Sequence, residues 1–353
     1  MHVEYVNTSD IIDVVLPSKV YAYVGGEFNI YNENVAYITQ KNRYYVYWVI
    51  DDIADYKVYS DRLRILPTSD MIGTHEVTLQ VLDRFDNSVV YSKSFTLEIV
   101  ANIPVTNKKV LFIGDSLTNA GYYPHFVEYL SNNGIQSIGT RESEVWSSFV
   151  EGRKDIVHHE GRGGWSAMDY VRNYAEYRTD APNPFWNPST NKFDFSYYMT
   201  QQGYSKPDAV FINLGTNLVY FLTGTINATK EMITSIHAYD STIPIFVSLI
   251  IPPATQEGRA YSGHGDSCVF EKQARNQRKE YIKEFENKLA NVDVSPVYFN
   301  LDRYYDFPTA EEPVSQRNPT IVVRQTDGTH PRRFGYYKMG DVYFANIMKV
   351  LST

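Results

Sequence analysis

A chain of 353 residues is long enough for about two domains, and its 43% hydrophobic and 21% charged residues are typical of a soluble globular protein. The net charge of −8 provides no basic surface for nucleic acid, and no apolar run approaches the ~20 residues of a membrane span. The single cysteine, Cys268, excludes an internal disulfide and a metal site made from several cysteines. The first residues lack a basic region followed by an apolar stretch, so no signal peptide is visible.

The first 102 residues predict a β-sandwich. Short runs rich in Val, Ile, Tyr and Thr alternate with turn residues, and no long helical period appears. Residues 73–81 and 95–100 resemble the last two strands of bacterial immunoglobulin-like modules, and we expect Trp48 in the core of the sandwich. This part contains no candidate nucleophile or base, so we expect it to position substrate or to anchor the protein. The predicted strands are 19–24, 28–31, 44–50, 62–66, 75–82 and 89–100.

From residue 108 onward the pattern changes to alternating strands and helices, which predicts a parallel sheet covered by helices. Residues 101–107 look like a linker, because Pro104 interrupts the strand pattern. We therefore predict a sandwich domain over 1–104 and an α/β domain over 105–353. The predicted strands are 110–113, 209–214, 245–250 and 297–300, and the predicted helices are 118–133, 167–177, 226–239, 271–289 and 335–351.

A serine lies at the corner between the first of these strands and the first helix. Residues 108–117 read as an apolar strand that runs into the turn Gly114-Asp115-Ser116. Such a corner holds the serine hydroxyl at the carboxyl end of a strand, where α/β sheets bind ligands. It also places the serine N–H among the free donors of a helix start, where negative charge is stabilised. On its own, the same tetrapeptide could be only a turn.

Three further stretches carry residues that could take part in chemistry. Residues 160–166 form a glycine-rich loop whose backbone can approach a ligand closely. The strand 209–214 ends in Gly215-Thr216-Asn217, where an asparagine amide could donate to an oxyanion or could simply close a turn. In 327–331 the i,i+3 spacing of Asp327 and His330 can join the carboxylate to one imidazole nitrogen and leave the other free to take a proton. Taken alone, this last stretch could also be a polar loop.

Together the four stretches resemble the SGNH, or GDSL-type, hydrolase family over residue 108 to the C-terminus. The resemblance implies a three-layer α/β/α fold and a serine esterase that works through an acyl-enzyme intermediate, with no metal or organic cofactor. It implies that Ser116 is the nucleophile, His330 the general base and then acid, and Asp327 its partner. It also implies an oxyanion hole made by the N–H groups of Ser116 and Gly164 and the amide of Asn217.

The match departs from the family at one position. The third block of the family continues with Asp after the asparagine, whereas Leu218 follows Asn217 here. The asparagine is the donor, so we expect the oxyanion hole to persist while the support of this loop changes.

The substrate is predicted from aromatic residues that follow the motifs. Trp165, Tyr220 and Phe221 lie beside the predicted oxyanion donors, and we expect them to bind substrate. Within the family, a fused β-sandwich suggests action on acetylated carbohydrate, so the first hypothesis is a carbohydrate O-acetylesterase. A lipid or general carboxyl-esterase is the alternative within enzymes, and a non-catalytic carbohydrate-binding or structural surface protein is the alternative outside them. The expected partner is an acylated small molecule or polysaccharide.

Three histidines outside the motifs have simpler interpretations. His158 and His159 stand beside Glu160 without further ligands at metal-binding spacing, so we expect a solvated loop there. His264 lies in a long segment after the strand at 245–250, where loops often shape a substrate pocket. The family context favours an extracellular, periplasmic or particle-associated location over a cytoplasmic one.

Overall fold

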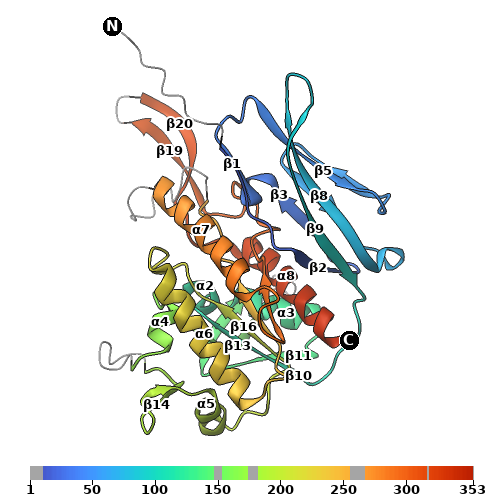
Figure 1. Cartoon of the computed structure of the whole chain (residues 1–353). Coiled ribbons are helices and arrows are strands. Elements are labelled where there is room, and N and C mark those ends of the chain that lie inside the picture. The colour runs from blue at the N-terminus through green and yellow to red at the C-terminus, as the bar shows by residue number, and fades with distance from the viewer. Residues whose placement is uncertain (1–10, 147–152, 174–181, 255–266, 316–317, 353) are drawn as a thin grey trace.

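The computed structural model describes residues 11–146, 153–173, 182–254, 267–315 and 318–352. A strand-rich N-terminal part packs beside a larger α/β part (Figure 1). Residues 101–107 join the two and contain no helix or strand. The domain boundary between residues 104 and 105 stays a prediction.

The N-terminal part is the predicted β-sandwich. It combines a four-stranded sheet in the order β2-β9-β8-β5 with a three-stranded sheet in the order β3-β7-β6. Trp48 is fully buried in the core, as expected, with its ring edge-on to Phe95 and its indole N–H donating to Asn32 Oδ1 at 2.8 Å. β8 and β9 form the expected antiparallel pair. The elements are β1 (Ile12–Val14), β2 (Lys19–Tyr23), β3 (Phe28–Tyr31), α1 (Asn32–Val35), β4 (Ala36–Ile38), β5 (Tyr44–Ile50), β6 (Tyr56–Val58), β7 (Arg62–Ile65), a 3-10 turn (Ser69–Met71), β8 (Gly73–Asp83) and β9 (Val89–Val100).

The α/β part is built on a seven-stranded sheet in the order β12-β13-β10-β16-β17-β18, with β11 also pairing with β10. All pairs are parallel except β12 with β13, which closes one edge. The elements of this part are β10 (Lys108–Gly114), α2 (Ser116–Asn119), α3 (Tyr122–Leu130), β11 (Ile135–Ile138), β12 (Arg141–Trp146), β13 (Lys154–Gly161), α4 (Ala167–Tyr170), β14 (Trp186–Asn187), β15 (Lys192–Phe193), α5 (Phe195–Gln202), β16 (Ala209–Asn213), α6 (Leu222–Tyr239), β17 (Ile245–Ser248), α7 (Ser267–Phe285), β18 (Val292–Ser295), β19 (Thr309–Ser315), β20 (Asn318–Gln325) and α8 (Arg333–Leu351).

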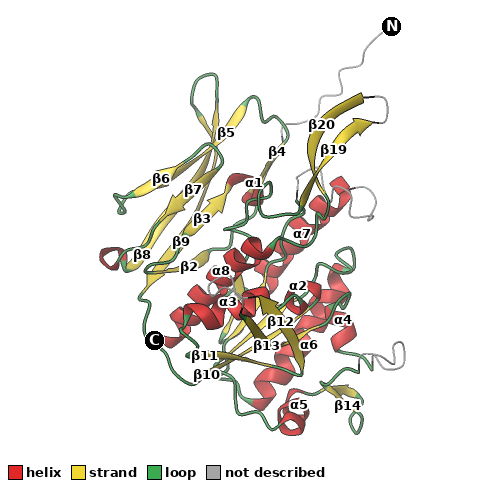
Figure 2. Cartoon of the chain, turned by 180° about the vertical axis from the view of Figure 1, so that it is seen from behind, coloured by secondary structure: helices red, strands yellow, loops and turns green. Residues whose placement is uncertain are grey.

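Helices cover both faces of this sheet, so its central strands are apolar on both sides. On one face, Phe112 of β10 and Phe211 of β16 stack at 5.1 Å and contact Tyr343 of α8. α3 lies beside α8 on that face, and α6 and α7 cover the other (Figure 2). Within the described ranges, no helix has the length and apolar character needed to cross a membrane.

The sheet brings three of the sequence motifs to one edge. Gly114 at the end of β10 is in register with Gly161 of β13 on one side and with Asn213 of β16 on the other. The chain leaves all three strands at their carboxyl ends, which is where ligands bind in α/β sheets. The fold therefore places the serine turn between the glycine loop and the Gly-Thr-Asn turn.

Three predicted elements are wrong in detail. The helix expected over 167–177 ends at Tyr170, and residues 174–177 lie outside the described residues. The strand expected at 297–300 lies instead at Val292–Ser295, which pairs with β17, while residues 297–300 form a buried turn. The helix expected over 118–133 is split into α2 and α3 at Gly121, whose φ is +74°. A Cβ at Gly121 would lie 2.6 Å from the Cβ of Ser143, so only glycine fits where the chain passes β12.

Candidate active site

Ser116 is the first residue of α2, directly after β10 ends. The Asp115 side chain accepts from the backbone N–H of Leu117 at 2.9 Å and so caps the short helix. Gly114 allows the tight corner, because a Cβ there would lie 1.8 Å from Thr118 Oγ1 and 2.9 Å from the Asn213 carbonyl oxygen. The sequence therefore forces the chain to turn where the serine emerges at the sheet edge.

The structure joins Ser116, His330 and Asp327 in a hydrogen-bonded line. His330 Nε2 lies 2.9 Å from Ser116 Oγ, and His330 Nδ1 lies 2.9 Å from Asp327 Oδ2. The other carboxylate oxygen of Asp327 accepts from the backbone N–H groups of Thr329 at 2.8 Å and His330 at 3.0 Å. With Nδ1–H donated to the carboxylate, Nε2 is left to accept the serine proton.

Hydrogen bonds keep Asp327 ionised. Partial burial alone would raise the pKa of this carboxyl, but the backbone N–H groups of His330 and Thr329, together with the imidazole, hold the pKa below its ordinary value.

The side chains of His330 and Asp327 are 41% and 37% exposed, so the outer side of the site is open to solvent in the described part of the chain.

The expected oxyanion donors come from two loops that contact each other. Gly164 is exposed and has a φ of +78°, which glycine adopts without strain. The Asn217 amide nitrogen donates to the carbonyl oxygen of Trp165 at 2.9 Å. This bond uses one of two amide hydrogens and fixes which way the amide faces, so a second N–H remains to donate.

Leu218, the departure from the family pattern, has a φ of +57°. This left-handed conformation is unfavourable for a residue with a branched side chain. The turn is closed by the Phe221 N–H, which donates to the Leu218 carbonyl oxygen at 2.8 Å. Val219 anchors it by packing in a small buried cluster with Ile250 and Ala274.

Of the three aromatic residues expected to bind substrate, two are accessible. Tyr220 is 61% and Phe221 53% exposed, with ring centroids 4.9 Å apart. Trp165 is only 1% exposed and packs edge-on against Tyr170, so the prediction that its ring binds substrate is wrong. The Trp165 ring packs into the core beneath the glycine loop, while the Trp165 backbone carbonyl oxygen accepts from the Asn217 amide. His264 lies outside the described residues.

A buried polar cluster that was not expected from the sequence lies beneath the glycine loop. Glu160 is fully buried on β13 and forms an ion pair with Arg162 at 2.5 Å. Its carboxylate also accepts from the Thr140 N–H at 2.6 Å and from the Tyr198 hydroxyl at 2.8 Å. Arg162 lies over the Trp165 ring, and its own N–H donates to the Gly114 carbonyl at 2.9 Å. The signal was present in the sequence as an acidic and a basic residue two positions apart in the glycine-rich stretch.

The solvated loop expected around His158 and His159 is instead part of β13. His159 is fully buried and accepts from the Gly161 N–H at Nδ1, while Nε2 faces the Ser143 hydroxyl at 2.8 Å. Burial lowers the pKa of His159 to about 3, so the ring is neutral. Among the described residues, no three His, Cys, Asp or Glu side chains are grouped so that they could hold a metal ion.

Comparison with solved structures gives chains of low sequence identity. A carbohydrate esterase family 3 protein from Talaromyces cellulolyticus is 17% identical, with a TM-score of 0.46, over 70% of this chain and 100% of that one. A mutant acetyl esterase with acetate ion is 16% identical, with a TM-score of 0.44, over 70% of this chain and 99% of that one. A member of the lipolytic protein G-D-S-L family from Veillonella parvula is 15% identical, with a TM-score of 0.35, over 68% and 97%.

Comparison with protein families gives a match over most of the α/β part. No curated protein matches the sequence. The model of the family described as GDSL-like Lipase/Acylhydrolase matches residues 110–342, which is more than half of the chain and includes all four motifs. The chain therefore belongs to the GDSL-like lipase/acylhydrolase family, and it is a serine esterase of that family with an N-terminal β-sandwich.

Proposed function

We propose that this esterase removes O-acetyl groups from carbohydrate. The single observation that carries the proposal is the open triad: the His330 and Asp327 side chains are more than a third exposed, and the accessible rings of Tyr220 and Phe221 follow Asn217. An open leaving-group side suits a bulky alcohol such as a polysaccharide. Aromatic faces beside it suit sugar rings.

In the proposed reaction, Ser116 Oγ attacks the ester carbonyl while His330 Nε2 takes the serine proton. The tetrahedral oxyanion accepts from the N–H groups of Ser116 and Gly164 and from the second N–H of the Asn217 amide. His330 then gives the proton to the departing sugar oxygen, which leaves the acyl group on Ser116. Water, activated by the same imidazole, releases acetate and restores the serine.

The chemistry of the acyl group distinguishes this proposal from the lipid-esterase alternative. An acetyl methyl needs almost no apolar surface, whereas a long chain gains about 0.8 kcal/mol for each methylene that it buries. An enzyme with an acyl groove would thus gain roughly 5 kcal/mol between acetate and octanoate, if all six methylenes were buried. An open triad offers little surface for such a gain.

The test is a series of p-nitrophenyl esters from acetate to octanoate, combined with acetate release from a panel of acetylated polysaccharides. We expect kcat/KM to be highest for acetate and to fall sharply by butyrate, and we expect acetate release from at least one polysaccharide. Ser116→Ala is the matched control and should lower kcat by several orders of magnitude while leaving the melting temperature nearly unchanged. A rise of kcat/KM toward octanoate would replace this proposal by the lipid esterase, and an active Ser116→Ala variant would remove the catalytic assignment.

A further inference from the structure

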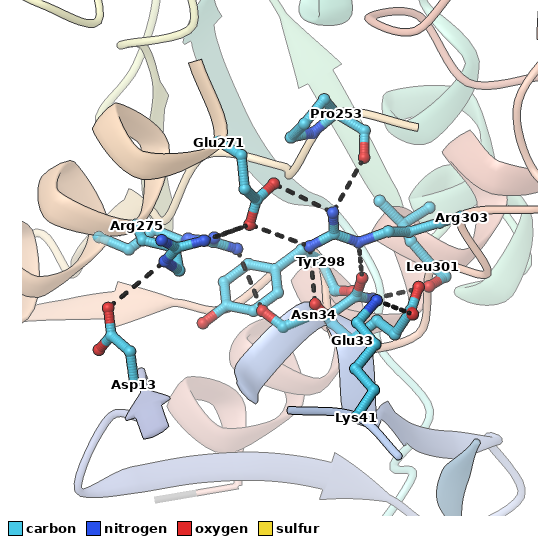
Figure 3. A network of polar contacts seen from close by, with 11 residues as sticks. Asp13, Glu33, Asn34, Lys41, Pro253, Glu271, Arg275, Tyr298, Leu301 and Arg303 are labelled. Atoms are coloured by element: carbon cyan, nitrogen blue, oxygen red, sulfur yellow. Dashed lines mark hydrogen bonds and ion pairs between the residues drawn. The ribbon is translucent and has the colours of Figure 1, made fainter. Parts of the chain in front are cut away.

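Arg303 lies at the contact between the sandwich and the α/β part, where it is only 5% exposed (Figure 3). Toward the sandwich, its Nε donates to Asn34 Oδ1 at 2.9 Å and its Nη2 to the Glu33 carbonyl oxygen at 2.7 Å. Both acceptors belong to α1. One guanidinium thus makes two hydrogen bonds to a single turn of the sandwich.

The same guanidinium also binds two elements of the α/β part. Its Nη1 donates to Glu271 Oε2 on α7 at 3.0 Å and to the Pro253 carbonyl oxygen at 3.4 Å (Figure 3). Pro253 follows β17, so Arg303 holds the chain that leaves this strand against α7 and α1.

The residue after Pro253 contacts the loop that carries Asp327 and His330. The backbone N–H of Ala254 donates to the Gly328 carbonyl oxygen at 3.1 Å, and Gly328 lies between Asp327 and His330. On the other side of this loop, the N–H of Arg332 donates to the Asp306 carbonyl oxygen at 2.5 Å. Asp306 lies three residues beyond Arg303. The loop that carries Asp327 and His330 is therefore hydrogen-bonded on both sides to backbone next to groups that Arg303 contacts, namely Ala254 after Pro253 and Asp306 after Arg303 itself.

The shortness of α1 explains why the sandwich can supply these acceptors. The helix has four residues, and the last carbonyl groups of a helix accept hydrogen bonds from outside it: the Glu33 carbonyl oxygen accepts from Arg303 at 2.7 Å. Arg278 of α7, which is fully buried, donates to the Asn34 carbonyl oxygen at 3.2 Å. The Asn34 amide in turn donates to the carbonyl oxygens of Tyr298 and Leu301, both at 2.7 Å.

The charges of this cluster make the sandwich contacts necessary. Glu271 is surrounded by the guanidinium groups of Arg275, Arg278 and Arg303, and Asp13 of β1 pairs with Arg275 at 3.4 Å. Three guanidinium groups thus share two carboxylates, so positive charge exceeds negative charge among these groups. Buried charge is costly unless polar groups replace its hydration. The carbonyls of α1 do so here, and without them the guanidinium groups would have to turn toward water.

We infer that the sandwich positions the catalytic histidine, with Asn34 and Arg303 as the positioning residues. The side chain of Asn34 and the Glu33 carbonyl oxygen of α1 accept from Arg303. Arg303 in turn donates to the Pro253 carbonyl oxygen. The next residue, Ala254, donates to the loop that carries Asp327 and His330. The N-terminal domain is thereby part of the esterase itself, in addition to any contact that it makes with a polymer. This inference rests on the proposed roles of Ser116 and His330.

The test uses full-length point variants and p-nitrophenyl acetate. Asn34→Ala and Arg303→Lys should each lower kcat about 10- to 100-fold, because a shift of about 1 Å in a reacting group can cost this much. KM should change by less than about twofold, since neither residue contacts the ester. Amide hydrogen exchange in the segment 326–332 should become faster in both variants, which reports on the loop under native conditions even where the melting temperature drops.

Glu286→Gln is the control at the other end of the same interface, where Glu286 accepts from the N–H groups of Ser18 and Lys19. It should change kcat by less than about twofold and leave exchange in 326–332 unchanged. Wild-type kcat in both Asn34→Ala and Arg303→Lys, or an equal loss in Glu286→Gln, would overturn the inference. Ser116→Ala is assayed beside them: activity there overturns the catalytic assignment, whereas unaltered positioning variants beside an inactive Ser116→Ala overturn the positioning role alone.

Discussion

Leu218 carries the least favourable backbone conformation next to the active site. Its φ of +57° is one that glycine and asparagine tolerate, and it costs a branched residue about 1–2 kcal/mol. The neighbouring Val219 is 5% exposed in a buried cluster, and Phe221 closes the turn. Packing on one side and a backbone hydrogen bond on the other therefore hold Leu218 in place. The same turn keeps Asn217 directed at the Trp165 carbonyl.

The positive φ of Leu218 predicts that glycine is more stable than alanine at this position, which is the reverse of their usual order. In ordinary positions glycine is less stable than alanine, but at a positive φ the glycine has no Cβ to clash. Leu218→Gly should therefore have a free energy of unfolding about 1 kcal/mol higher than Leu218→Ala, measured by urea denaturation. Both variants lose the same side-chain packing beyond Cβ, so the comparison isolates the backbone. An alanine variant that is the more stable of the two would show that the turn relaxes away from this conformation.

The residues of the triad could be predicted from the sequence, whereas the environment of the site could not. Ser116, Asp327 and His330 stand in short motifs whose local geometry is set by glycines, caps and an i,i+3 spacing. The direction of the Trp165 ring depends on Tyr170 and Arg162, which reach it only in the folded protein. Local spacing therefore predicted which polar side chains come together, and tertiary packing decided which aromatic rings are exposed.

At the scale of elements, β13 and the loop that follows it form one rigid unit beneath the proposed oxyanion hole. Glu160 at the end of the strand holds Arg162 in the loop, and the Tyr170 hydroxyl donates to the Gly114 carbonyl oxygen at 2.8 Å. The charge of Arg162 in the loop is thus paired with Glu160 of the strand. The backbone N–H of Arg162 also donates to the Gly114 carbonyl oxygen, which joins the loop to the serine turn.

Removing either member of this buried pair should be costly, and the two losses should not add. Glu160→Gln leaves Arg162 buried without a counter-charge, so we expect a loss of about 3–5 kcal/mol in the free energy of unfolding. Arg162→Met should cost a similar amount because Glu160 is then uncompensated. The double variant should be less destabilised than the sum of the two, as a double-mutant cycle by urea denaturation would measure. Additive losses would mean that the two charges are stabilised separately by other partners.

The elements that the sequence predicts best are those with a strong local pattern. The strands 28–31, 44–50 and 89–100 have the predicted bounds, because alternation and turn residues define both ends. The position of β18 could not be predicted, because residues 297–300 (Val-Tyr-Phe-Asn) are more apolar than residues 292–295 (Val-Asp-Val-Ser), and only pairing with β17 decides between them. The hairpin of β19 and β20 was not predicted, since each strand contains a proline and neither shows a clear alternation of apolar and polar residues.

At the scale of the whole molecule, the two parts meet in buried acid–hydroxyl contacts as well as in the arginine cluster. Tyr23 of β2 donates to Asp341 Oδ1 of α8 at 2.7 Å, and its ring packs edge-on against Phe344. Burial raises the pKa of Asp341 to about 7, even though the tyrosine hydroxyl stabilises the carboxylate. The protein therefore holds a carboxyl group at the interface that is protonated in mild acid.

The contribution of this acid to stability falls with rising pH. Between pH ~3.9, where an Asp of the unfolded chain titrates, and about 7, the folded state binds the extra proton. The contribution of Asp341 to the free energy of unfolding therefore decreases through this window, by roughly 4 kcal/mol in all, and it is lost completely above the window. His159, with its pKa of about 3, acts in the opposite direction, because the unfolded state binds the proton up to pH ~6.5.

Asp341→Asn should remove the first of these two slopes. The amide has the shape of the carboxyl and can still accept from Tyr23, so the variant should be more stable than the wild type above pH 7 and nearly equal at pH 4. Thermal melts at pH 4, 6 and 8 would measure the difference, and Glu76→Gln, which changes an exposed carboxylate on β8, is the matched control. A wild-type advantage at pH 8 would show that the ionised acid is stabilising at the interface.

The long sequence separations in this fold have a consequence for how the enzyme is made. The proposed nucleophile Ser116 and its proposed base His330 are 214 residues apart, and Asn34 meets Arg303 across 269 residues. A ribosome releases the sandwich first, so the carbonyls of α1 stay uncovered until residue 303 has emerged. A nascent chain that stalls before residue 330 already displays Ser116 but has no base beside it. In the proposed mechanism the growing polypeptide is thus inert, and hydrolysis begins only after His330 has left the ribosome and the histidine has folded against Ser116.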